Sequence, residues 1–260
     1  MNDPTYTEYL ALEQVLAAHR PRSDAHDETL FIVIHHVMEL WMRLVLHELA
    51  AAKARLRADE LAPASKILTR VARAQQQLIG GWDVLATMTP NEFAAVRPKL
   101  GASSGFQSAQ NRLLEFALGQ KDARALAHQT GEWRAALETA REEPSLYDEA
   151  LRVLARRGLP VPPERLERDW RETYTPHPAV AAAWATVYRE PERWWDLYDL
   201  AEKLVDLDYR YAQWRFAHLK TEERIIGQKM GTGASSGVAY LAGVVERRFF
   251  PELVDARAAL

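Results

Sequence analysis

Apolar residues recur at three- and four-residue steps along most of this chain, which is the spacing of an α-helix. Residues 27–56 show it most clearly, because this stretch contains neither glycine nor proline. It carries two apolar lines, one of Phe31, Ile34, Met38, Trp41, Val45 and Leu49 and one of Val33, Val37, Leu40 and Leu44. Two such lines predict a helix that is buried on most sides.

Cap and breaker residues delimit three further helices. Residues 63–88 have helical spacing, and Gly80-Gly81 predicts a break or kink near the end of that helix. Thr89-Pro90, with Glu92 three residues after the threonine, predicts the start of a short helix. Residues 192–226 are the longest uninterrupted segment, about 50 Å as one helix, and glycine at 227 is a natural stop.

Strand signals are scarce, because β-branched residues rarely alternate with polar ones and no Asn-Gly or Asp-Gly turn occurs. The proline-bearing stretch around residues 120–180 predicts a variable excursion of shorter helices and loops rather than an independent domain. We therefore expect an all-α fold with long central helices, in a single domain over residues 1–260.

The pentapeptide GASSG occurs twice, at residues 101–105 and 233–237. Ser104 and Gln107 have capping-box spacing, so the first copy predicts a helix over FQSAQNRLLEFAL, residues 106–118. The second copy lacks the lysine and the spacing of phosphate-binding loops. It is either a flexible connection or a mobile lid whose backbone N–H groups and Thr232 hydroxyl approach an anionic ligand.

The composition narrows the chemistry further. The 260 residues include no cysteine, which excludes disulfides, thiolate metal sites and a cysteine nucleophile. The net charge of −3, with basic residues spread along the chain, argues against nucleic acid or an anionic membrane as partner. No apolar run approaches the roughly 20 residues that span a bilayer, and no signal peptide is recognisable, so we expect a cytoplasmic protein.

Two histidines share helical faces with apolar residues. His35 lies on a line with Met38 and Met42, and His218 on a line with Trp214, and such surroundings favour a neutral imidazole. Each is either a satisfied core histidine or a group that binds a metal or a ligand. HExxH and Glu-x-x-His frameworks are missing. A single axial imidazole on haem iron, in an apolar slot between helices, stays open.

Two other polar residues are ambiguous from their pattern. His36 lies with Arg43 and His47 on a polar stripe, which predicts contact with solvent. Arg97 is either a solvated surface arginine or a bidentate clamp on a carboxylate.

Four long phrases resemble one family in order and spacing. They are LFIVIHHVMELWMRLVLHEL, TPNEFAAVRPKLGASSGFQSAQNRLLE, WRFAHLKT and GTGASSGVAYLAGVVERRFFPELVDAR. With them the chain resembles the tryptophan 2,3-dioxygenases over nearly its whole length. The resemblance implies a helical bundle around a haem pocket, a homotetramer, and cleavage of the indole C2–C3 bond of L-tryptophan by O2 to give N-formylkynurenine.

The resemblance also implies roles for matching residues. His218 would be the axial ligand of a non-covalent haem b, and His35 the distal imidazole that accepts the indole N–H. Arg97 would bind the substrate carboxylate, and Thr232 would contact the polar groups of the amino acid. Ser104 matches a serine beside the haem.

Five apolar or aromatic positions complete the implied site. Phe31 and Phe93 would wall the indole pocket. Tyr6, Tyr9 and Leu10 match an N-terminal segment, here residues 1–20, that in the family packs on a neighbouring subunit and reaches its site.

Two positions depart from the family pattern and keep alternatives open. Ala234 replaces a glycine of the second serine loop, and His36 stands where a glutamine is usual. They motivate a haem-dependent monooxygenase of the same superfamily that acts on tryptophan or a substituted tryptophan, for example with oxindole formation. A non-enzymatic helical interaction protein or haem carrier is a third interpretation.

Overall fold

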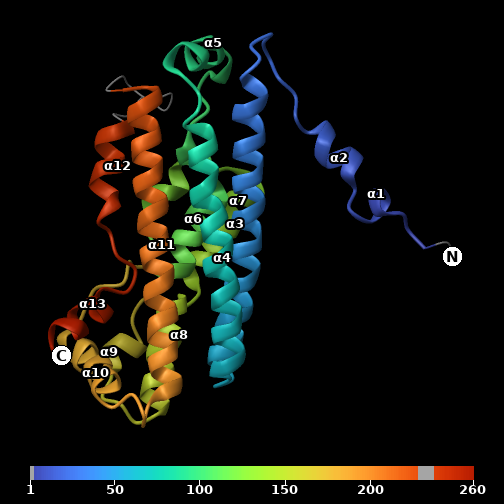
Figure 1. The fold of residues 1–260 in the computed structure, drawn as a ribbon. Coiled ribbons are helices and arrows are strands. Elements are labelled where there is room, and N and C mark those ends of the chain that lie inside the picture. The colour runs from blue at the N-terminus through green and yellow to red at the C-terminus, as the bar shows by residue number, and fades with distance from the viewer. Residues whose placement is uncertain (1–2, 228–236) are drawn as a thin grey trace.

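Three long helices run side by side and form the body of the molecule (Figure 1). The computed structural model describes residues 3–227 and 237–260, and within them it contains helices and loops but no strand. The long helices are α3 (Glu28–Arg57), α4 (Leu61–Leu85) and α11 (Trp195–Ile225), with α4 packed against both of the others. The predicted all-α fold with long central helices is confirmed.

Helix α3 buries one side and exposes the other. Met38, Val45 and Leu49 are buried where α3 packs on α4, α6 and α8. Val37 and Leu40 of the second apolar line are exposed, Leu40 by 58%. The prediction that this helix is buried on most sides is wrong, because α3 lies at the edge of the bundle and no described element covers its outer face.

By length and composition, α3 also meets the criteria for a membrane-spanning helix, with a mean hydropathy of 1.5 in an 18-residue window. The expectation that no apolar run approaches the length of a bilayer is not overturned, because His35, His36, Glu39 and Arg43 interrupt this stretch. The core helices of helical bundles meet the same criteria, and α3 packs along three other helices of this chain.

Helix α4 passes through Gly80 and Gly81 without a break, so the predicted interruption is also wrong. Gly81 faces α3 closely. A Cβ added there would lie 2.9 Å from the Cε of Met38 and 3.9 Å from a methyl group of Ile34. The glycine therefore permits close packing of α3 and α4 rather than ending the helix.

Both predicted capping boxes are present, but one of them caps a different element from the one predicted. Thr89 and Glu92 form a capping box at the start of α5 (Pro90–Leu100). Ser104 and Gln107 also form a capping box, but it caps a short 3₁₀ turn, η1 (Gly105–Gln107), rather than the predicted helix. Ser108 then caps α6 (Ala109–Leu118).

Helix α11 begins at Trp195, three residues later than predicted, and ends at Ile225. Gly227 follows it with φ +65°, the left-handed conformation that glycine adopts without strain. The predicted stop is confirmed.

The stretch between α6 and α11 contains short helices, of which α8 and α10 contribute buried residues to the main core. The short helices are η2 (Ala123–His128), α7 (Gly131–Glu142), α8 (Leu146–Arg156), α9 (Pro163–Leu166) and α10 (Pro178–Arg189). In α8, Leu146, Tyr147 and Leu151 are fully buried. The apolar face of α8 thus belongs to the main core.

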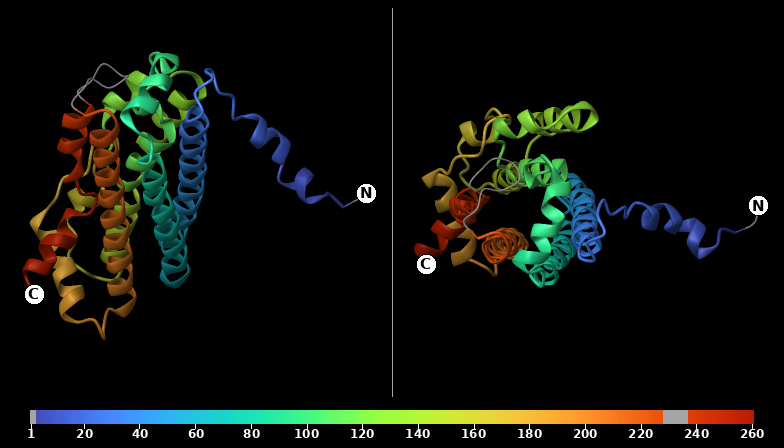
Figure 2. Two further views of the ribbon diagram at one scale, coloured as in Figure 1. Left: turned by 45° about the horizontal axis from the view of Figure 1, so that its top comes forward. Right: turned by 90° about the horizontal axis from the view of Figure 1, so that it is seen from above.

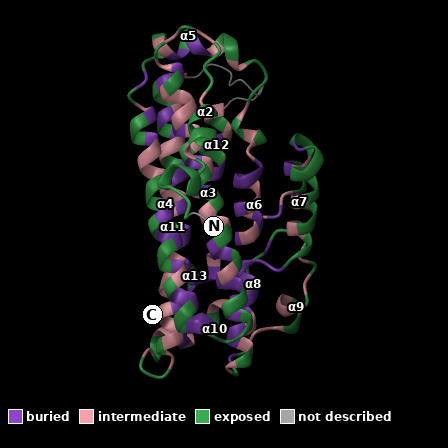
Figure 3. Ribbon diagram, turned by 90° about the vertical axis from the view of Figure 1, so that its right-hand side faces the viewer, coloured by how far each residue is buried: buried purple, intermediate pink, exposed green. Residues whose placement is uncertain are grey.

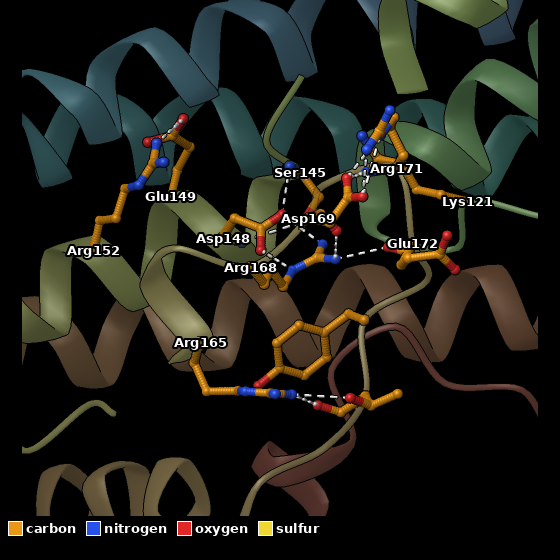
Figure 4. A network of polar contacts seen from close by, with 12 residues as sticks. Lys121, Ser145, Asp148, Glu149, Arg152, Arg165, Arg168, Asp169, Arg171 and Glu172 are labelled. Carbon is orange, nitrogen blue, oxygen red and sulfur yellow. Dashed lines mark hydrogen bonds and ion pairs between the residues drawn. The ribbon is translucent and has the colours of Figure 1, made fainter. Parts of the chain in front are cut away.

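A polar network fastens the loop after α9 onto α8 (Figure 4). Asp148 accepts two hydrogen bonds from Arg168, at 2.7 and 2.9 Å, and both side chains are almost fully buried. Arg168 also donates to the backbone carbonyl of Glu172 at 2.7 Å. Such a charge-assisted, bidentate pair fixes the geometry of the loop.

The two ends of the chain behave differently. Helices α12 (Gly237–Val245) and α13 (Pro251–Ala258) pack on α11 and α10. Helices α1 (Tyr6–Tyr9) and α2 (Leu12–Ala17) bury no residue and extend away from the bundle (Figure 2), toward the viewer in Figure 3. We call residues 3–17 the N-terminal arm.

Candidate functional site

A cavity of about 550 Å³ lies between α3, α4, α5, α6, α11 and α12. These helices are arranged in a ring when the bundle is viewed from above (Figure 2, right). The volume falls within the range of roughly 300–1,000 Å³ that is usual for small-molecule and cofactor sites. His35 of α3 and His218 of α11 both line this cavity.

The orientation of His35 is fixed by its own helix. Its Nδ1 lies 2.7 Å from the carbonyl oxygen of Phe31, one turn earlier. Because a carbonyl can only accept, Nδ1 carries the proton and donates, and Nε2 is left as an acceptor. Burial lowers the pKa of His35 below its ordinary value of 6.5, against the backbone hydrogen bond to Phe31. The neutral ring is therefore the favoured form.

His218 is held between two tryptophans. Its ring stacks on Trp82 of α4, with centroids 4.2 Å apart and planes inclined by 8°, and it lies 5.8 Å from the ring of Trp214. Its Nε2 is 3.7 Å from a carboxylate oxygen of Glu222, too far for a hydrogen bond. The imidazole is thus fixed in orientation and keeps a ring nitrogen available to a ligand.

Apolar side chains make up one wall of the cavity. Phe31 and Phe93 lie 6.2 Å apart, and Phe31 also packs on His35 at 4.1 Å. Further lining comes from Met38, Met42, Trp82, Leu85, Met88 and Leu100. A flat aromatic group fits such a wall by burial of its faces.

The other wall is polar. Arg112 of α6 donates to Glu115 at 2.6 Å. Arg215 of α11 donates to Gln120 at 2.8 Å and to the carbonyl of Arg247 at 2.8 Å. The cavity therefore joins an apolar wall to one that carries two guanidinium groups.

Three buried N–H groups of the lining have no acceptor among the described residues. They are the Nε of Arg112 and the indole Nε1 of Trp82 and Trp214. Buried donors without a partner carry a free-energy cost in native proteins. A bound molecule with acceptor groups would satisfy these three donors.

The first GASSG segment and the last residue of the second border this cavity. Ser103, Ser104 and Gly105 of the first line it, as does Gly237, the last residue of the second. Just beyond the first segment, Phe106 packs edge-on against Tyr240 of α12, with ring centroids 4.7 Å apart. Two segments separated by more than a hundred residues thus meet at one site.

The structure brings together only part of the predicted set. Phe31, His35, Phe93, Ser104 and His218 line the cavity. Of the other predicted residues, four do not line the cavity and one, Thr232, lies outside the described residues.

Arg97 is half-buried on α5, one turn after Phe93, and is not among the residues that line the cavity. Thr232 lies outside the described residues, as does Ala234. Tyr6, Tyr9 and Leu10 lie on the exposed N-terminal arm, away from the cavity of their own chain. His36 points away from the cavity, with its ring 4.9 Å from that of His19.

Sequence reasoning missed several lining residues. Glu39 follows His35 by four residues, the spacing of one helix face, so its place could have been predicted. Trp82, Arg112 and Tyr240 reach the cavity from three other helices. Nothing local in the sequence marks them, because only the packing of the helices brings them to the histidines.

Comparison with known proteins gives matches over the whole chain. The family model described as tryptophan 2,3-dioxygenase matches residues 1–143 and 137–260. A tryptophan 2,3-dioxygenase of Erythrobacter litoralis is 54% identical over 260 residues, which cover 99% of each chain. One of Polaromonas sp. is 54% identical over 99% of this chain and 88% of that protein. One of Burkholderia pseudomallei is 52% identical over 98% of this chain and 84% of that protein.

Proposed function

Because the chain belongs to the tryptophan 2,3-dioxygenase family, we propose that it catalyses the cleavage of the indole C2–C3 bond of L-tryptophan by O2. The product is N-formylkynurenine. Both oxygen atoms enter it, one as the ketone and one as the formyl carbonyl, so the reaction needs no external reductant. The observation that carries the proposal is the convergence of His35 and His218 on one cavity within a chain of this family.

The residues of the cavity fit haem b as the cofactor. His218, held by its stack on Trp82, would bind the haem iron, and the apolar side chains of the cavity would bury the macrocycle. The orphaned N–H of Arg112 suits an anionic carboxylate, and the haem propionates are such groups. When bound, the haem iron supplies the activation of O2.

The protein contributes binding and orientation of the substrate. Nε2 of neutral His35 is placed to accept the indole N–H, because Nδ1 is already engaged with Phe31. Phe31 and Phe93 confine the indole ring beside it. A fixed ring position lets bound indole and O2 react as neighbours rather than by a chance encounter, and burial of the ring against the apolar wall keeps water from it.

The polar end of tryptophan has its own partners in this proposal. Arg97 binds the carboxylate as a charge-assisted clamp, after movement of α5 or of its side chain toward the cavity. Thr232 contacts the same end from the second serine loop. Ser104 is already at the cavity, where its hydroxyl accepts from the backbone N–H of Phe106 at 3.3 Å.

We further propose that the enzyme is a cytoplasmic homotetramer. Tyr6, Tyr9 and Leu10 are exposed by 74%, 79% and 40%. Their burial on a neighbouring subunit would remove this apolar surface from water. In that assembly the N-terminal arm of one subunit completes the site of another.

The function is tested by reconstituting the protein with haem under reducing conditions and supplying L-tryptophan with ¹⁸O2. We expect N-formylkynurenine with both labelled atoms. His218→Ala is the matched control and should fail to retain haem, as judged by its Soret absorption. A singly labelled oxindole would establish the monooxygenase alternative, and a wild-type protein that binds no haem would overturn both oxygenase functions.

A further inference from the structure

A series of hydrogen bonds connects α3 to α11 through α6, and three of its residues, Glu39, Ser108 and Asn111, line the cavity. The carboxylate of Glu39 accepts from the Ser108 hydroxyl at 2.6 Å and from the Gln110 amide at 2.7 Å. Ser108 Oγ accepts from the backbone N–H of Asn111 at 3.2 Å. The Asn111 side-chain oxygen accepts from the Tyr211 hydroxyl at 2.6 Å. We call Glu39, Ser108, Asn111 and Tyr211 the α6 bridge.

The two ends of the α6 bridge lie on the helices that carry the two imidazoles. Glu39 is one helical turn after His35 on α3, and Tyr211 is two turns before His218 on α11. On the other side of the cavity, α4 packs against both α3 and α11. Helix α4 and the α6 bridge therefore both hold α3 and α11 at their separation.

The end of the α6 bridge on α11 is buried, and its end on α3 is half-buried. Asn111 is 7% exposed and Tyr211 is 4% exposed. Burial raises the pKa of Tyr211, so its phenol stays protonated and remains a donor. Gln110 adds a second bond to α3, from its amide to the backbone carbonyl of Glu39 at 2.9 Å. Buried, mutually polarised bonds of this kind hold a geometry more strictly than apolar contacts do.

We propose that the α6 bridge sets the separation of His35 and His218, with Glu39 and Tyr211 as positioning residues for the oxygenation. Ser108 is the turning point, since its hydroxyl both donates to Glu39 and caps α6. This inference rests on the proposed function, because the separation matters only if haem and tryptophan stack between the two rings.

The test uses Tyr211→Phe, which removes one hydroxyl and keeps the ring. Tyr188→Phe is the matched control. Tyr188 donates to Glu202 at the same 2.6 Å and also ties another helix to α11. Like Tyr211 it is not a lining residue of the cavity, but its hydrogen bond lies outside the α6 bridge. We expect kcat/KM for tryptophan to fall about tenfold in Tyr211→Phe, the effect of one hydrogen bond, and to stay within about twofold in Tyr188→Phe.

A double-variant cycle separates positioning from general stability. Glu39→Gln removes one acceptor from the other end of the α6 bridge, and we expect a similar loss of kcat/KM. Because the bonds act in series, Glu39→Gln combined with Tyr211→Phe should lose no more than the more damaging single variant. The tryptophan-induced change in haem absorption should also require more tryptophan in both single variants, while haem binding persists.

Additive losses in the double variant would overturn the α6 bridge as a unit. Equal losses in Tyr188→Phe, or an effect confined to the unfolding temperature, would overturn the positioning role. Wild-type protein that fails to bind haem or to form product would instead overturn the proposed function. An active wild type with an unaltered Tyr211→Phe variant leaves that function intact and removes only this inference.

Discussion

At the scale of single residues, the protonation state of His35 decides what this site can bind. The hydrogen bond from Nδ1 to the Phe31 carbonyl fixes which nitrogen is the acceptor. Burial fixes the charge, because the desolvated ring favours its neutral form. A protonated His35 would present an N–H toward the indole N–H and could not accept from it.

The pH dependence of turnover follows from this pKa. Since the pKa of His35 is lowered from 6.5, the neutral acceptor persists as the pH falls through 6.5 and is lost only below that value. We expect kcat/KM to stay level down to about pH 6.5 and to decline at lower pH. His35→Gln, which keeps an acceptor but does not titrate, should lose about tenfold in kcat/KM and also lose the acid limb. An acid limb that begins above pH 6.5, or that survives in the variant, contradicts the assignment.

At the scale of secondary-structure elements, close contact of α3 and α4 shapes the apolar wall. Gly81 lets Met38 lie against the backbone of α4, and Met38 in turn lines the cavity. A Cβ added at the neighbouring Gly80 would meet no atom within 4 Å, so Gly80 has no such packing role. The two glycines are a matched pair on one helix.

Substituting each glycine by alanine should separate two effects on the free energy of unfolding, the helix propensity of alanine and the packing of its Cβ. Gly80→Ala should raise the free energy of unfolding by about 0.5–1 kcal/mol, because alanine loses less backbone entropy in a helix. Gly81→Ala should raise the free energy of unfolding by less, because the added Cβ would lie 2.9 Å from the Cε of Met38 and that side chain must move. Denaturant unfolding of both variants measures the difference, and equal gains would refute the role of Gly81 in packing.

At the scale of the whole molecule, the N-terminal arm contrasts with the bundle. The body has one main buried core, to which α3, α4, α8, α10, α11 and α13 contribute. The N-terminal arm contributes no residue to it and leaves Leu16 exposed by 64% in addition to its tyrosines. Apolar residues on an extended segment are typical of a surface that is covered by a partner, and a neighbouring subunit is the partner that we propose.

Deletion of residues 1–17 tests this assembly. Each shortened subunit should still fold and keep the helical content of its bundle, because the deleted helices bury nothing within their own chain. Light scattering should report a lower mass than for the full chain, which we expect to be tetrameric. An unchanged mass would place the subunit interface elsewhere.

The sequence by itself determined what depends on neighbouring residues. Helical periodicity located α3, α4 and α11, and side-chain caps located the start of α5 and the turn at Ser104. It also placed His35 and His218 on apolar faces, and the family phrases linked both residues to one site. These features are local, since a helix bonds each residue to another four positions away.

Only the tertiary structure decided which distant residues meet. In it, α4 continues through Gly80 and Gly81, Leu40 is exposed, and the ring of Trp82 stacks on that of His218. It also joined Glu39 to Tyr211 through α6. Such contacts depend on how whole helix faces pack, and packing is a property of the assembled core that no short stretch of sequence contains.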